Sequence, residues 1–557
     1  MTPEPRRSVL AMKAYVPPLE GRRSVIRLDF NENTTGFPDL LGEDPPELFT
    51  AYPEYAEAVS AVANWVGVNP EQVLLTNGSD EGLFVSAFTF LEPGHDRALV
   101  SAPTFSLIPH SLRLCQAEVL EVVVKPDLGF DLQGLEEALR SGVKLTMLAS
   151  PDNPTGAVLP RDLLERWLSE FPQTVFVIDE AYYEYHGETA LELSAPNLLV
   201  SRTFSKAWGL AGLRLGFLVG HRQMIEYLRR VRSPYSVNSL AVKHLLQVLP
   251  HAERVKAQAT EVMERKLKIV EAVRAAGYSV TEGKANFFVV WAGPDARWLE
   301  AWMREHGILV RDRSNLPRMA GSVRVSVGSP EEMEKFLEVL ASFRERTALI
   351  FDLDDTLVDT SVSYDRCIME LAGASHEEVN ALRAEGGFND DWEAATELLR
   401  RKGVERELAE VEAEGQQAYF KIAPVVEKPF FAPGLLERLA VRHRLFVFTG
   451  RPRCEYDPVW GERLDGYFEQ VLCKGEHGLP AKPAPDGVLH LMEKHDIRRG
   501  YYVGNSVDDM ACGVRSGLVP VGVTSNQSAE VLGGAGAEHL LSSVNELPGL
   551  LMMEDVE

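Results

Sequence analysis

One lysine and one cluster of carboxylates are the residues of this sequence best suited to covalent chemistry. Lys206 lies in SRTFSKAWGLAGLRLG (201–216), a segment rich in Ser, Thr and Gly that follows a predicted buried strand. A lysine held in a cleft can form a Schiff base with a carbonyl compound. Asp352 and Asp354 follow another apolar strand in ALIFDLDDT. There, one carboxylate can attack phosphorus while the other transfers a proton to the leaving oxygen.

Other residues of the first half could hold an aromatic cofactor beside Lys206. Asp179 ends the strand TVFVID, where a carboxylate could hold the proton of a pyridinium nitrogen. Asn153, in the turn SPDNPTG, could donate a hydrogen bond to a phenolic oxygen, and Phe105 could stack on a ring. The helix predicted to begin in NGSDEGL (77–83) offers N–H groups that suit a phosphate. Each feature singly has an ordinary explanation, but together they match the needs of pyridoxal phosphate.

The elements that must position these residues alternate between strands and helices along both halves of the chain. Apolar runs that end in polar residues predict buried parallel strands at 145–150, 174–179 and 198–203. This alternation favours an α/β architecture, in which ligands bind beyond the carboxyl ends of the strands. Residues 329–346, which begin with Ser-Pro, predict a single helix.

The strand in ALIFD begins almost directly after that helix, which predicts a domain boundary near residue 346. Residues 1–346 are predicted to form a large and a small domain, and residues 347–557 to form a separate domain with a helical cap. The predicted bounds are about 40–250 for the large domain, about 10–35 with 251–346 for the small domain, and about 361–432 for the cap.

Composition narrows the functional classes. The 557 residues carry a net charge of −25, which disfavours a nucleic-acid partner because such a partner needs a basic face. No apolar run approaches the roughly 20 residues of a membrane span, and the first residues lack the apolar core of a signal peptide. The five cysteines form no CxxC pair, which predicts reduced thiols. We therefore expect a cytoplasmic enzyme with no membrane partner.

Residues 10–340 resemble the fold-type I aminotransferases that use pyridoxal phosphate, and most of all the histidinol-phosphate aminotransferases. The motifs in family order are AYVPPLEGRR, LDFNENTTG, AYPEY, NGSDEG, SPDNPTG, IDEAYYEY, RTFSKAWGLAGLRLG, SPYSVNSLA and RDRSNLPRMAGSVRVSVG. The resemblance implies that Lys206 forms the imine with the cofactor and moves the substrate proton. It implies that Asp179 holds the ring nitrogen and that Phe105 stacks on the ring. The implied partners of the cofactor's oxygen and phosphate are Asn153, Tyr182, Ser79, Asp80, Thr203, Ser205 and Arg214.

The resemblance further implies a homodimer and a phosphorylated substrate. Tyr52 matches the tyrosine that reaches the cofactor phosphate of the neighbouring subunit. Arg311 and Arg324 match the pair that receives the substrate phosphate, and the later arginine also receives the carboxylate of glutamate, which leaves as 2-oxoglutarate. Tyr15 and Asn33 match positions near the substrate. Threonine-phosphate decarboxylases share this scaffold, so decarboxylation of a phospho-amino acid is an alternative reaction.

The second half, over about 346–550, resembles the haloacid dehalogenase (HAD) superfamily, whose first motif is DxDxT. The resemblance implies that Asp352 is the nucleophile and Asp354 the proton donor. Thr449 in FVFTG matches a donor of a hydrogen bond to phosphate, and Lys482 in AKPAP matches the cation that neutralises the phosphoryl group. Carboxylates this close require a cation, which implies Mg²⁺. The implied metal residues are Asp352, Asp354, Asn505, Asp508 and Asp509.

Asn505 departs from the usual fourth HAD motif, GDxxxD, whose first aspartate is a metal ligand. An asparagine can offer a carbonyl oxygen but contributes no charge. We therefore expect weaker Mg²⁺ binding, which Asp508 could offset, or a domain that only binds its ligand.

The fusion predicts a bifunctional enzyme of histidine biosynthesis. Its first half would make L-histidinol phosphate from imidazole acetol phosphate and glutamate, and its second half would remove the phosphate. Two further alternatives stay open for the second half: hydrolysis of an unrelated phosphoester, and a non-catalytic binding role.

Overall fold

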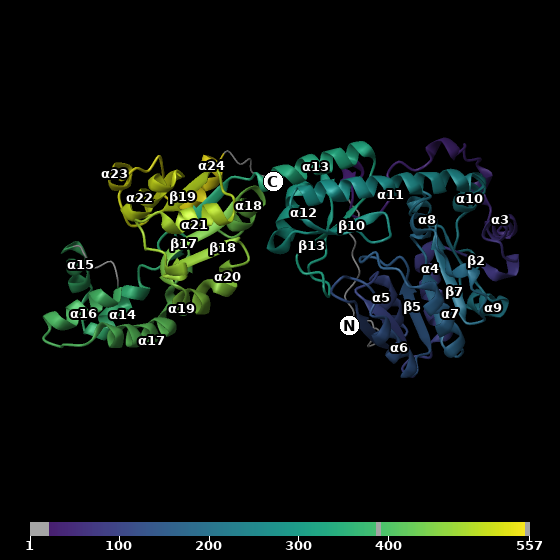
Figure 1. The fold of residues 1–557 in the computed structure, drawn as a ribbon, viewed down its shortest axis with the longest axis horizontal. Helices are drawn as coiled ribbons and strands as arrows, with labels where there is room; N and C mark the ends of the chain where they lie inside the picture. The colour runs from purple at the N-terminus through teal and green to yellow at the C-terminus, as the bar shows by residue number, and fades with distance from the viewer. Residues whose placement is uncertain (1–21, 386–390, 552–557) are drawn as a thin grey trace. The chain divides into compact units, whose positions relative to one another are not determined.

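The computed structural model describes residues 22–385 and 391–551 of the chain. The chain divides into two compact units between Phe343 and Arg344. Figure 1 labels the helices and strands of each unit. In the described part of the chain, no helix is both long enough and apolar enough to cross a membrane.

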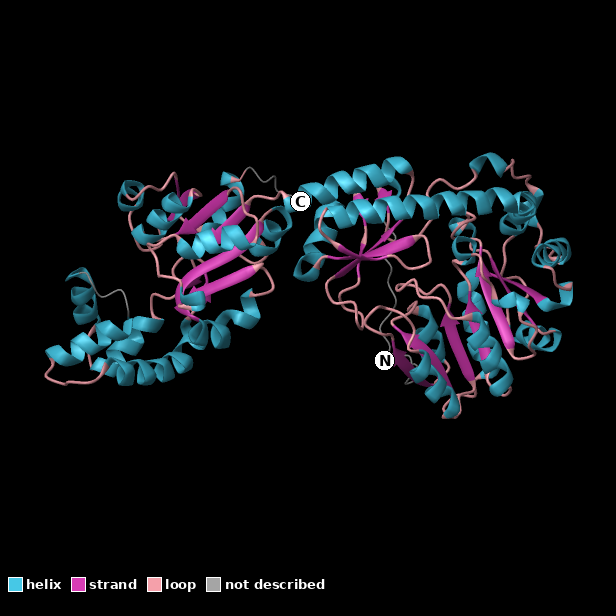
Figure 2. Cartoon of the chain, viewed as in Figure 1, coloured by secondary structure: helices cyan, strands magenta, loops and turns pink. Residues whose placement is uncertain are grey.

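The first unit is built around a seven-stranded mixed sheet (Figure 2). In spatial order its strands are β2 (Val73–Thr76), β8 (Gly216–Gly220), β7 (Leu198–Thr203), β6 (Val175–Asp179), β5 (Leu145–Ala149), β3 (Arg97–Ala102) and β4 (Glu118–Val123). Strand β8 runs antiparallel to both of its neighbours, and the other pairs are parallel. The three strands predicted from apolar runs are confirmed as β5, β6 and β7, and the α/β fold class is confirmed with them.

Helices cover both faces of this sheet, which is why its central strands β5, β6 and β7 are buried along their whole length. One face packs against α4 (Gly78–Phe90), α5 (Leu107–Leu114) and α9 (Arg222–Val231), and the other against α6 (Leu132–Arg140) and α7 (Arg161–Glu170). Successive residues of a strand point to opposite faces, so alternate side chains enter each of these two cores. Each fully buried Leu, Ile or Val stabilises the fold by about 1.5–3 kcal/mol.

A smaller antiparallel sheet completes the first unit. Its strand order is β12 (Arg311–Asp312), β13 (Ser322–Ser326), β10 (Phe287–Trp291) and β9 (Ser279–Thr281). The register places Arg311 directly opposite Arg324. The helices of this region are α11 (Ala252–Ala275), α12 (Ala296–Glu305) and α13 (Pro330–Arg344). Helix α13 confirms the helix predicted at 329–346 to within two residues at its end.

The second unit contains a six-stranded parallel sheet with its first strand in the middle. The strand order is β18 (Gln470–Lys474), β17 (Arg444–Pro452), β14 (Ala348–Phe351), β19 (Gly500–Gly504), β20 (Val519–Val523) and β21 (His539–Leu541). Because β17, β14 and β19 are parallel neighbours, the residues at their carboxyl ends gather at one edge. Asp352 directly follows β14 and Asn505 directly follows β19, so both lie at this edge, and Thr449 lies in the second half of β17.

Four helices lie in the segment predicted to be a cap. They are α14 (Ser363–Ala372), α15 (His376–Glu385), α16 (Asp391–Arg401) and α17 (Leu408–Val426). Their apolar side chains form a core that they share with one another, with Ile368, Leu382, Leu398 and Val411 among its buried members.

Candidate active sites

Almost all of the residues predicted to hold pyridoxal phosphate line one cavity of about 140 Å³ at the carboxyl edge of the large sheet. The predicted residues that line it are Ser79, Asp80, Phe105, Asn153, Asp179, Tyr182, Thr203, Ser205, Lys206 and Arg214. From Ser79 to Arg214 these residues span 136 positions of the sequence, so only the fold brings them together. Tyr52 lies elsewhere, with 77% of its surface exposed and its ring stacked on Tyr235 at a centroid distance of 4.5 Å.

Asp179 carries the most direct sign that a cofactor belongs in this cavity. It ends β6, and its Oδ1 is buried without a hydrogen-bond partner among the described residues. Burial raises the pKa of this carboxyl group from 3.8 to about 7. A buried carboxylate oxygen without a partner is costly, and a protonated pyridine nitrogen would supply both the hydrogen bond and the charge. The residues therefore fit pyridoxal phosphate.

The residues where β2 passes into α4 could hold the cofactor phosphate. Arg214 approaches the start of this helix, where its guanidinium pairs with Asp80 at 2.9 Å and donates to Ser205 Oγ at 3.3 Å. A side chain at Gly78 would place its Cβ 2.7 Å from the Arg214 guanidinium, so only glycine permits this approach. Open N–H groups of the first helical turn and an arginine together suit a phosphate.

Lys206 extends from the loop after β7, and its Nζ donates to the main-chain oxygen of Phe30 at 2.9 Å. Beside it, Asn31 donates its side-chain amide to the Tyr182 hydroxyl at 2.8 Å. The sequence predicted a substrate role for Asn33 and drew no attention to Asn31. The Asn33 amide donates to the main-chain oxygen of Ala207 and to the side chain of Gln258, each at 2.9 Å, and its substrate role stays a prediction.

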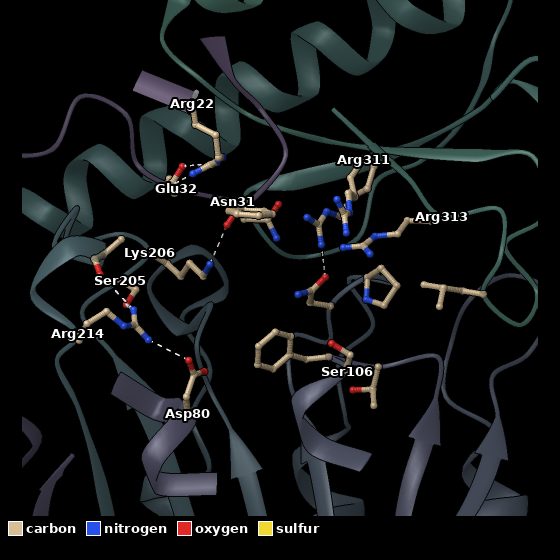
Figure 3. A pocket seen from close by; sticks show the side chains of 18 of the residues that line it. Arg22, Asn31, Glu32, Asp80, Ser106, Ser205, Lys206, Arg214, Arg311 and Arg313 are labelled. Atoms are coloured by element: carbon tan, nitrogen blue, oxygen red, sulfur yellow. Dashed lines mark hydrogen bonds and ion pairs between the residues drawn. The ribbon is translucent and has the colours of Figure 1, made fainter. Parts of the chain in front are cut away.

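A larger cavity of about 520 Å³ adjoins Lys206 and is rich in arginine (Figure 3). The predicted Arg311 and Arg324 line it, as do Arg22, Glu32 and Arg313, which sequence reasoning missed. A further set lines both cavities, namely Asp80, Phe105, Asn153, Ser205, Lys206 and Arg214. Asn33 lines neither cavity, and the predicted Tyr15 lies outside the described residues.

In the second unit, the predicted nucleophile and lysine are in direct contact. Lys482 Nζ pairs with the carboxylate of Asp352 and, at 2.7 Å, with that of Asp509. Burial raises the pKa of Asp352, and the Lys482 ammonium opposes that shift. Burial alone would lower the pKa of Lys482, but the two carboxylates outweigh it and raise the pKa well above its ordinary value. Thr449 is buried within β17, where its Oγ1 accepts from the Arg451 N–H at 3.0 Å.

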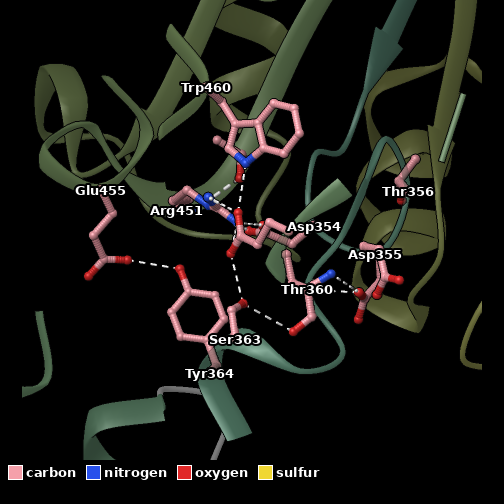
Figure 4. A network of polar contacts seen from close by, with 12 residues as sticks. Asp354, Asp355, Thr356, Thr360, Ser363, Tyr364, Arg451, Glu455 and Trp460 are labelled. Atoms are coloured by element: carbon pink, nitrogen blue, oxygen red, sulfur yellow. Dashed lines mark hydrogen bonds and ion pairs between the residues drawn. The ribbon is translucent and has the colours of Figure 1, made fainter. Parts of the chain in front are cut away.

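Asp354 joins a buried polar network that the sequence did not reveal (Figure 4). The guanidinium of Arg451, fully buried, pairs with Asp354 on one side and with Glu427 at 3.1 Å on the other. Glu427 also accepts from Trp460 Nε1 at 2.7 Å and from Ser363 Oγ at 2.7 Å. The proton donor proposed from the DxDxT motif is thus linked through one arginine to the helical segment.

The five residues predicted to hold Mg²⁺ do not form one cluster. Across the described ranges, no three His, Cys, Asp or Glu side chains are grouped as metal ligands. Asp354 faces Arg451, Asp509 faces Lys482, and Asp508 is half-buried in the first turn of α22 (Val507–Ser516). The Asp509 carboxylate also accepts from the Ser506 N–H at 3.1 Å as part of a capping box, and from Ser506 Oγ at 2.6 Å.

A smaller group of oxygen atoms that could bind a metal ion lies around Asn505. Its amide best satisfies its neighbours with the nitrogen facing the Asp352 carboxylate at 3.3 Å and the Asp354 main-chain oxygen at 3.2 Å, and with the oxygen facing Asn526 at 2.9 Å. A half-turn of the amide would bring its oxygen beside those two oxygens. Carboxylate, main-chain and amide oxygens are ligands that Mg²⁺ accepts, so this set fits the ion with a single negative charge.

Comparison with known proteins agrees with this geometry. Residues 25–340 match the family of class I and II aminotransferases, and residues 347–517 match the family of haloacid dehalogenase-like hydrolases. The histidinol-phosphate aminotransferase of Desulfitobacterium hafniense (strain Y51) is 35% identical over 352 residues, which cover 60% of this chain and 96% of that protein. The chain therefore belongs to the class I and II aminotransferases. It carries a HAD-like hydrolase domain after the aminotransferase domain, which confirms the predicted fusion.

Two solved structures share the fold of the first unit. The histidinol-phosphate aminotransferase from Sinorhizobium meliloti, in complex with pyridoxal 5′-phosphate, has a TM-score of 0.52 and 23% identity, covering 60% of this chain and 97% of that one. The L-threonine-O-3-phosphate decarboxylase from Porphyromonas gingivalis has a TM-score of 0.51 and 24% identity, covering 58% and 100%. The first unit therefore has the predicted fold-type I architecture.

Proposed function

We propose that this chain performs two reactions on one metabolite. The first unit transfers an amino group from glutamate to imidazole acetol phosphate, which gives 2-oxoglutarate and L-histidinol phosphate. The second unit hydrolyses L-histidinol phosphate to L-histidinol and phosphate. The observation that carries the proposal is the arginine-rich cavity beside Lys206, in a chain that also contains a HAD-like hydrolase. The 35% identity to a histidinol-phosphate aminotransferase supports the choice of the first substrate.

In the transamination, the residues of the chain bind the cofactor and move protons. Pyridoxal phosphate, when bound, supplies an electron sink and a carrier for the amino group. Asp179 would hold its ring nitrogen, Asn153 and Tyr182 would hold its oxygen, and the start of α4 with Arg214 would hold its phosphate. Lys206 Nζ would remove a proton from the substrate carbon that bears the nitrogen, and would then return a proton to complete the transfer. Arg324, which is 2% exposed, binds the carboxylate of glutamate.

In the hydrolysis, Asp352 attacks phosphorus and forms an aspartyl-phosphate as the bond to the leaving alcohol breaks. Asp354 protonates that alcohol and then takes a proton from the water that cleaves the aspartyl-phosphate. Lys482 neutralises charge on the phosphoryl oxygens, and Thr449 donates a hydrogen bond to them. Asp352, the main-chain oxygen of Asp354 and Asn505 would hold Mg²⁺, which would offset the charge between phosphate and nucleophile.

We also propose a cytoplasmic homodimer. Tyr52 and Tyr235 form an exposed aromatic pair, 77% and 58% exposed, which suits contact with a second copy. All five cysteines are free thiols, which suits a reducing compartment.

The proposal is tested by phosphate release from L-histidinol phosphate by the purified full-length protein, with Mg²⁺ and with excess EDTA. Release that needs Mg²⁺ supports the assignment of the second unit. A decarboxylase in the first unit would instead release CO₂ from a phospho-amino acid without any 2-oxo acid. Absence of phosphate release would leave the second unit with another phosphoester or with a binding role.

A further inference from the structure

A buried lysine holds the turn that leads into β10. Lys266 lies on α11 and is 1% exposed. Its Nζ donates to three main-chain oxygens, those of Glu282 at 3.2 Å, Gly283 at 3.0 Å and Ala285 at 2.7 Å. An ammonium group has three N–H donors, so the three oxygens match its full capacity. Lys266 thereby fixes the conformation of the turn formed by residues 282–285.

The charge of this lysine is balanced by main-chain oxygens and not by a carboxylate bonded to it. The carboxylate of Glu282 pairs with Arg274 at 2.8 Å instead. Burial lowers the pKa of Lys266 to about 8, so the ammonium form and its three donors persist at neutral pH. An apolar side chain at this position would avoid the cost of burying a charge. We therefore expect the role of Lys266 to lie in the geometry of the turn.

The turn contacts the loop that carries Asn153 with no side chain between the two backbones. Gly283 and Gly156 both have left-handed backbones, with φ of +61° and +71°. A Cβ added to Gly156 would lie 2.5 Å from the Cα of Gly283, and one added to Gly283 would lie 2.7 Å from the Cα of Gly156. The Lys284 N–H also donates to the main-chain oxygen of Gly156 at 2.8 Å. A shift of one backbone therefore moves the other, because no flexible side chain can absorb it.

Gly156 also belongs to the hydrogen bonds that close the loop around Asn153. Its N–H donates to the main-chain oxygen of Asp152 at 2.8 Å, and the Asp152 N–H donates to the main-chain oxygen of Ala157 at 2.8 Å. Asn153, enclosed by these bonds, lines both cavities of the first unit. The position of Asn153 therefore depends on Gly156, and through it on the turn that Lys266 holds.

We propose that Lys266 is a positioning residue for the cofactor site: it fixes the turn at 282–285 against Gly156 and thereby places the Asn153 amide beside the oxygen of bound pyridoxal phosphate. The proposal rests on the hydrogen bond from Asn153 to that oxygen, which is part of the proposed function. Lys266 lines neither cavity, so it acts through the two backbones that meet at Gly156. Loss of its ammonium group would relax the turn without removing any group that binds the cofactor.

The test follows the absorbance of the cofactor bound to the full-length protein as the pH is raised, without substrate. The absorbance reports the proton on the nitrogen that joins Lys206 to the cofactor. A donor at the cofactor oxygen withdraws negative charge that would otherwise hold this proton, so loss of the donor should raise the transition pH. Asn153→Ala should raise it by about one pH unit, the scale of one hydrogen bond to a charged group.

Lys266→Met should raise the transition pH by a smaller amount, about 0.3 to 0.7 unit, because it weakens that hydrogen bond without removing it. Lys266→Gln keeps two N–H donors and should shift it less than Lys266→Met does. The matched control is Lys268→Met, on the exposed side of the same helix, which should leave the transition unchanged.

A double variant separates positioning from a general loss of structure. In the Asn153→Ala background, Lys266→Met should produce no further shift, because it acts through a group that is already gone. Gly283→Ala leaves the lysine in place but forces the two backbones apart, so it should reproduce the shift of Lys266→Met. If Lys266→Met does not fold, Lys266→Gln and Gly283→Ala decide by the same comparison.

The positioning role is overturned if Lys266→Met leaves the transition pH unchanged while Asn153→Ala raises it. It is also overturned if Lys266→Met causes the same shift with and without Asn153. No shift in Asn153→Ala would remove the assigned hydrogen bond, and the role of Lys266 with it. Because the titration needs no substrate, these outcomes are distinct from a failure of the proposed transamination, which is measured as 2-oxoglutarate formation.

Discussion

The two active sites handle charge in opposite ways. The site of the first unit leaves a buried carboxylate oxygen of Asp179 without a partner and gathers arginines around an open cavity of about 520 Å³. In the second unit, Lys482 already pairs with Asp352 and Asp509, and Arg451 already pairs with Asp354 and Glu427. The first site is incomplete without its ligands, whereas the second compensates its charges internally.

This difference has a consequence for stability. A ligand that binds only the folded state stabilises it by an amount that grows with the logarithm of the ligand concentration divided by its Kd. A ligand that also pairs a buried group without a partner removes the free-energy cost of that group. We therefore expect pyridoxal phosphate to stabilise the first unit strongly. A phosphoester in the second unit must draw Lys482 partly away from its carboxylates, so we expect it to stabilise that unit less.

The largest effects should come from removing each nucleophile, which tests whether the two sites work independently. Lys206→Ala should lower transamination by at least about 10³-fold, since the group that forms the imine and moves the proton is lost. Asp352→Asn should lower phosphate release by a similar factor. Each variant should keep the other activity, measured separately as 2-oxoglutarate formation and as phosphate release from L-histidinol phosphate that is supplied directly. Loss of both activities in either variant would show that the sites are coupled.

Glu427→Gln tests whether internal pairing holds the second site together. The change leaves the buried guanidinium of Arg451 with Asp354 as its remaining carboxylate, and breaking a buried pair typically costs about 3–5 kcal/mol. Urea unfolding of the full-length protein should show this loss in the transition of the second unit. Glu414→Gln is the matched control, because Glu414 lies on the same helix in an exposed pair with Arg406 at 2.7 Å. Equal stability of the two variants would refute the role of the network.

Asp179→Asn tests the incomplete first site through its pH dependence. Burial raises the pKa of Asp179 from 3.8 to about 7, so the folded cofactor-free protein binds this proton more tightly than the unfolded chain does. Its stability should therefore fall as the pH rises from about 4 to about 7. Asn cannot ionise, so the variant should be more stable than wild type at pH 8, by roughly 2 kcal/mol after allowance for its own buried amide.

The measurement is thermal unfolding of the cofactor-free proteins at pH 5 and pH 8. The gap between variant and wild type should open at the higher pH and close at the lower one. The same variant should bind pyridoxal phosphate less tightly. A gap independent of pH would mean that the pKa of Asp179 in the folded protein is close to its value in the unfolded chain.

The smallest effect should come from a change at Asn505. The groups that would hold Mg²⁺, namely the Asp352 carboxylate, the Asp354 main-chain oxygen and the Asn505 amide, carry a single negative charge between them. Asn505→Asp should lower the Mg²⁺ concentration needed for half-maximal phosphate release by roughly tenfold, because a second carboxylate joins Asp352. Asp508→Asn is the comparison variant, since Asp508 lies half-buried on α22 outside the contacts that surround Asn505. An unchanged Mg²⁺ dependence in Asn505→Asp would show that residue 505 is not at the metal.

The sequence predicted the elements and residues whose signal is local. Asp179, Lys206 and Asp352 follow apolar strands, and strand ends are where open α/β sheets place ligands. The residues it missed act through distant contacts, such as Asn31 with Tyr182, 151 positions apart, and Arg451 with Asp354, 97 positions apart. Neither partner carries a pattern that reveals the other.

Asn31 and Asn33 show the same limit, because the sequence does not indicate which side chain faces the cavity. Both lie in NEN, an irregular segment without a period from which to read a facing direction. Asn31 has a left-handed backbone with φ of +55°, which asparagine tolerates well. With this local conformation, the Asn31 amide donates to the Tyr182 hydroxyl. The Asn33 side chain instead accepts from the Gly36 N–H within its own loop.

One experiment tests most directly whether the two sites serve a single metabolite. The full-length protein, loaded with pyridoxal phosphate and Mg²⁺, is given imidazole acetol phosphate with and without glutamate, and free phosphate is followed. We predict phosphate release that requires glutamate, begins after a lag while L-histidinol phosphate forms, and disappears in both Lys206→Ala and Asp352→Asn. Phosphate release without glutamate, or 2-oxoglutarate formation without any phosphate release, would contradict the account.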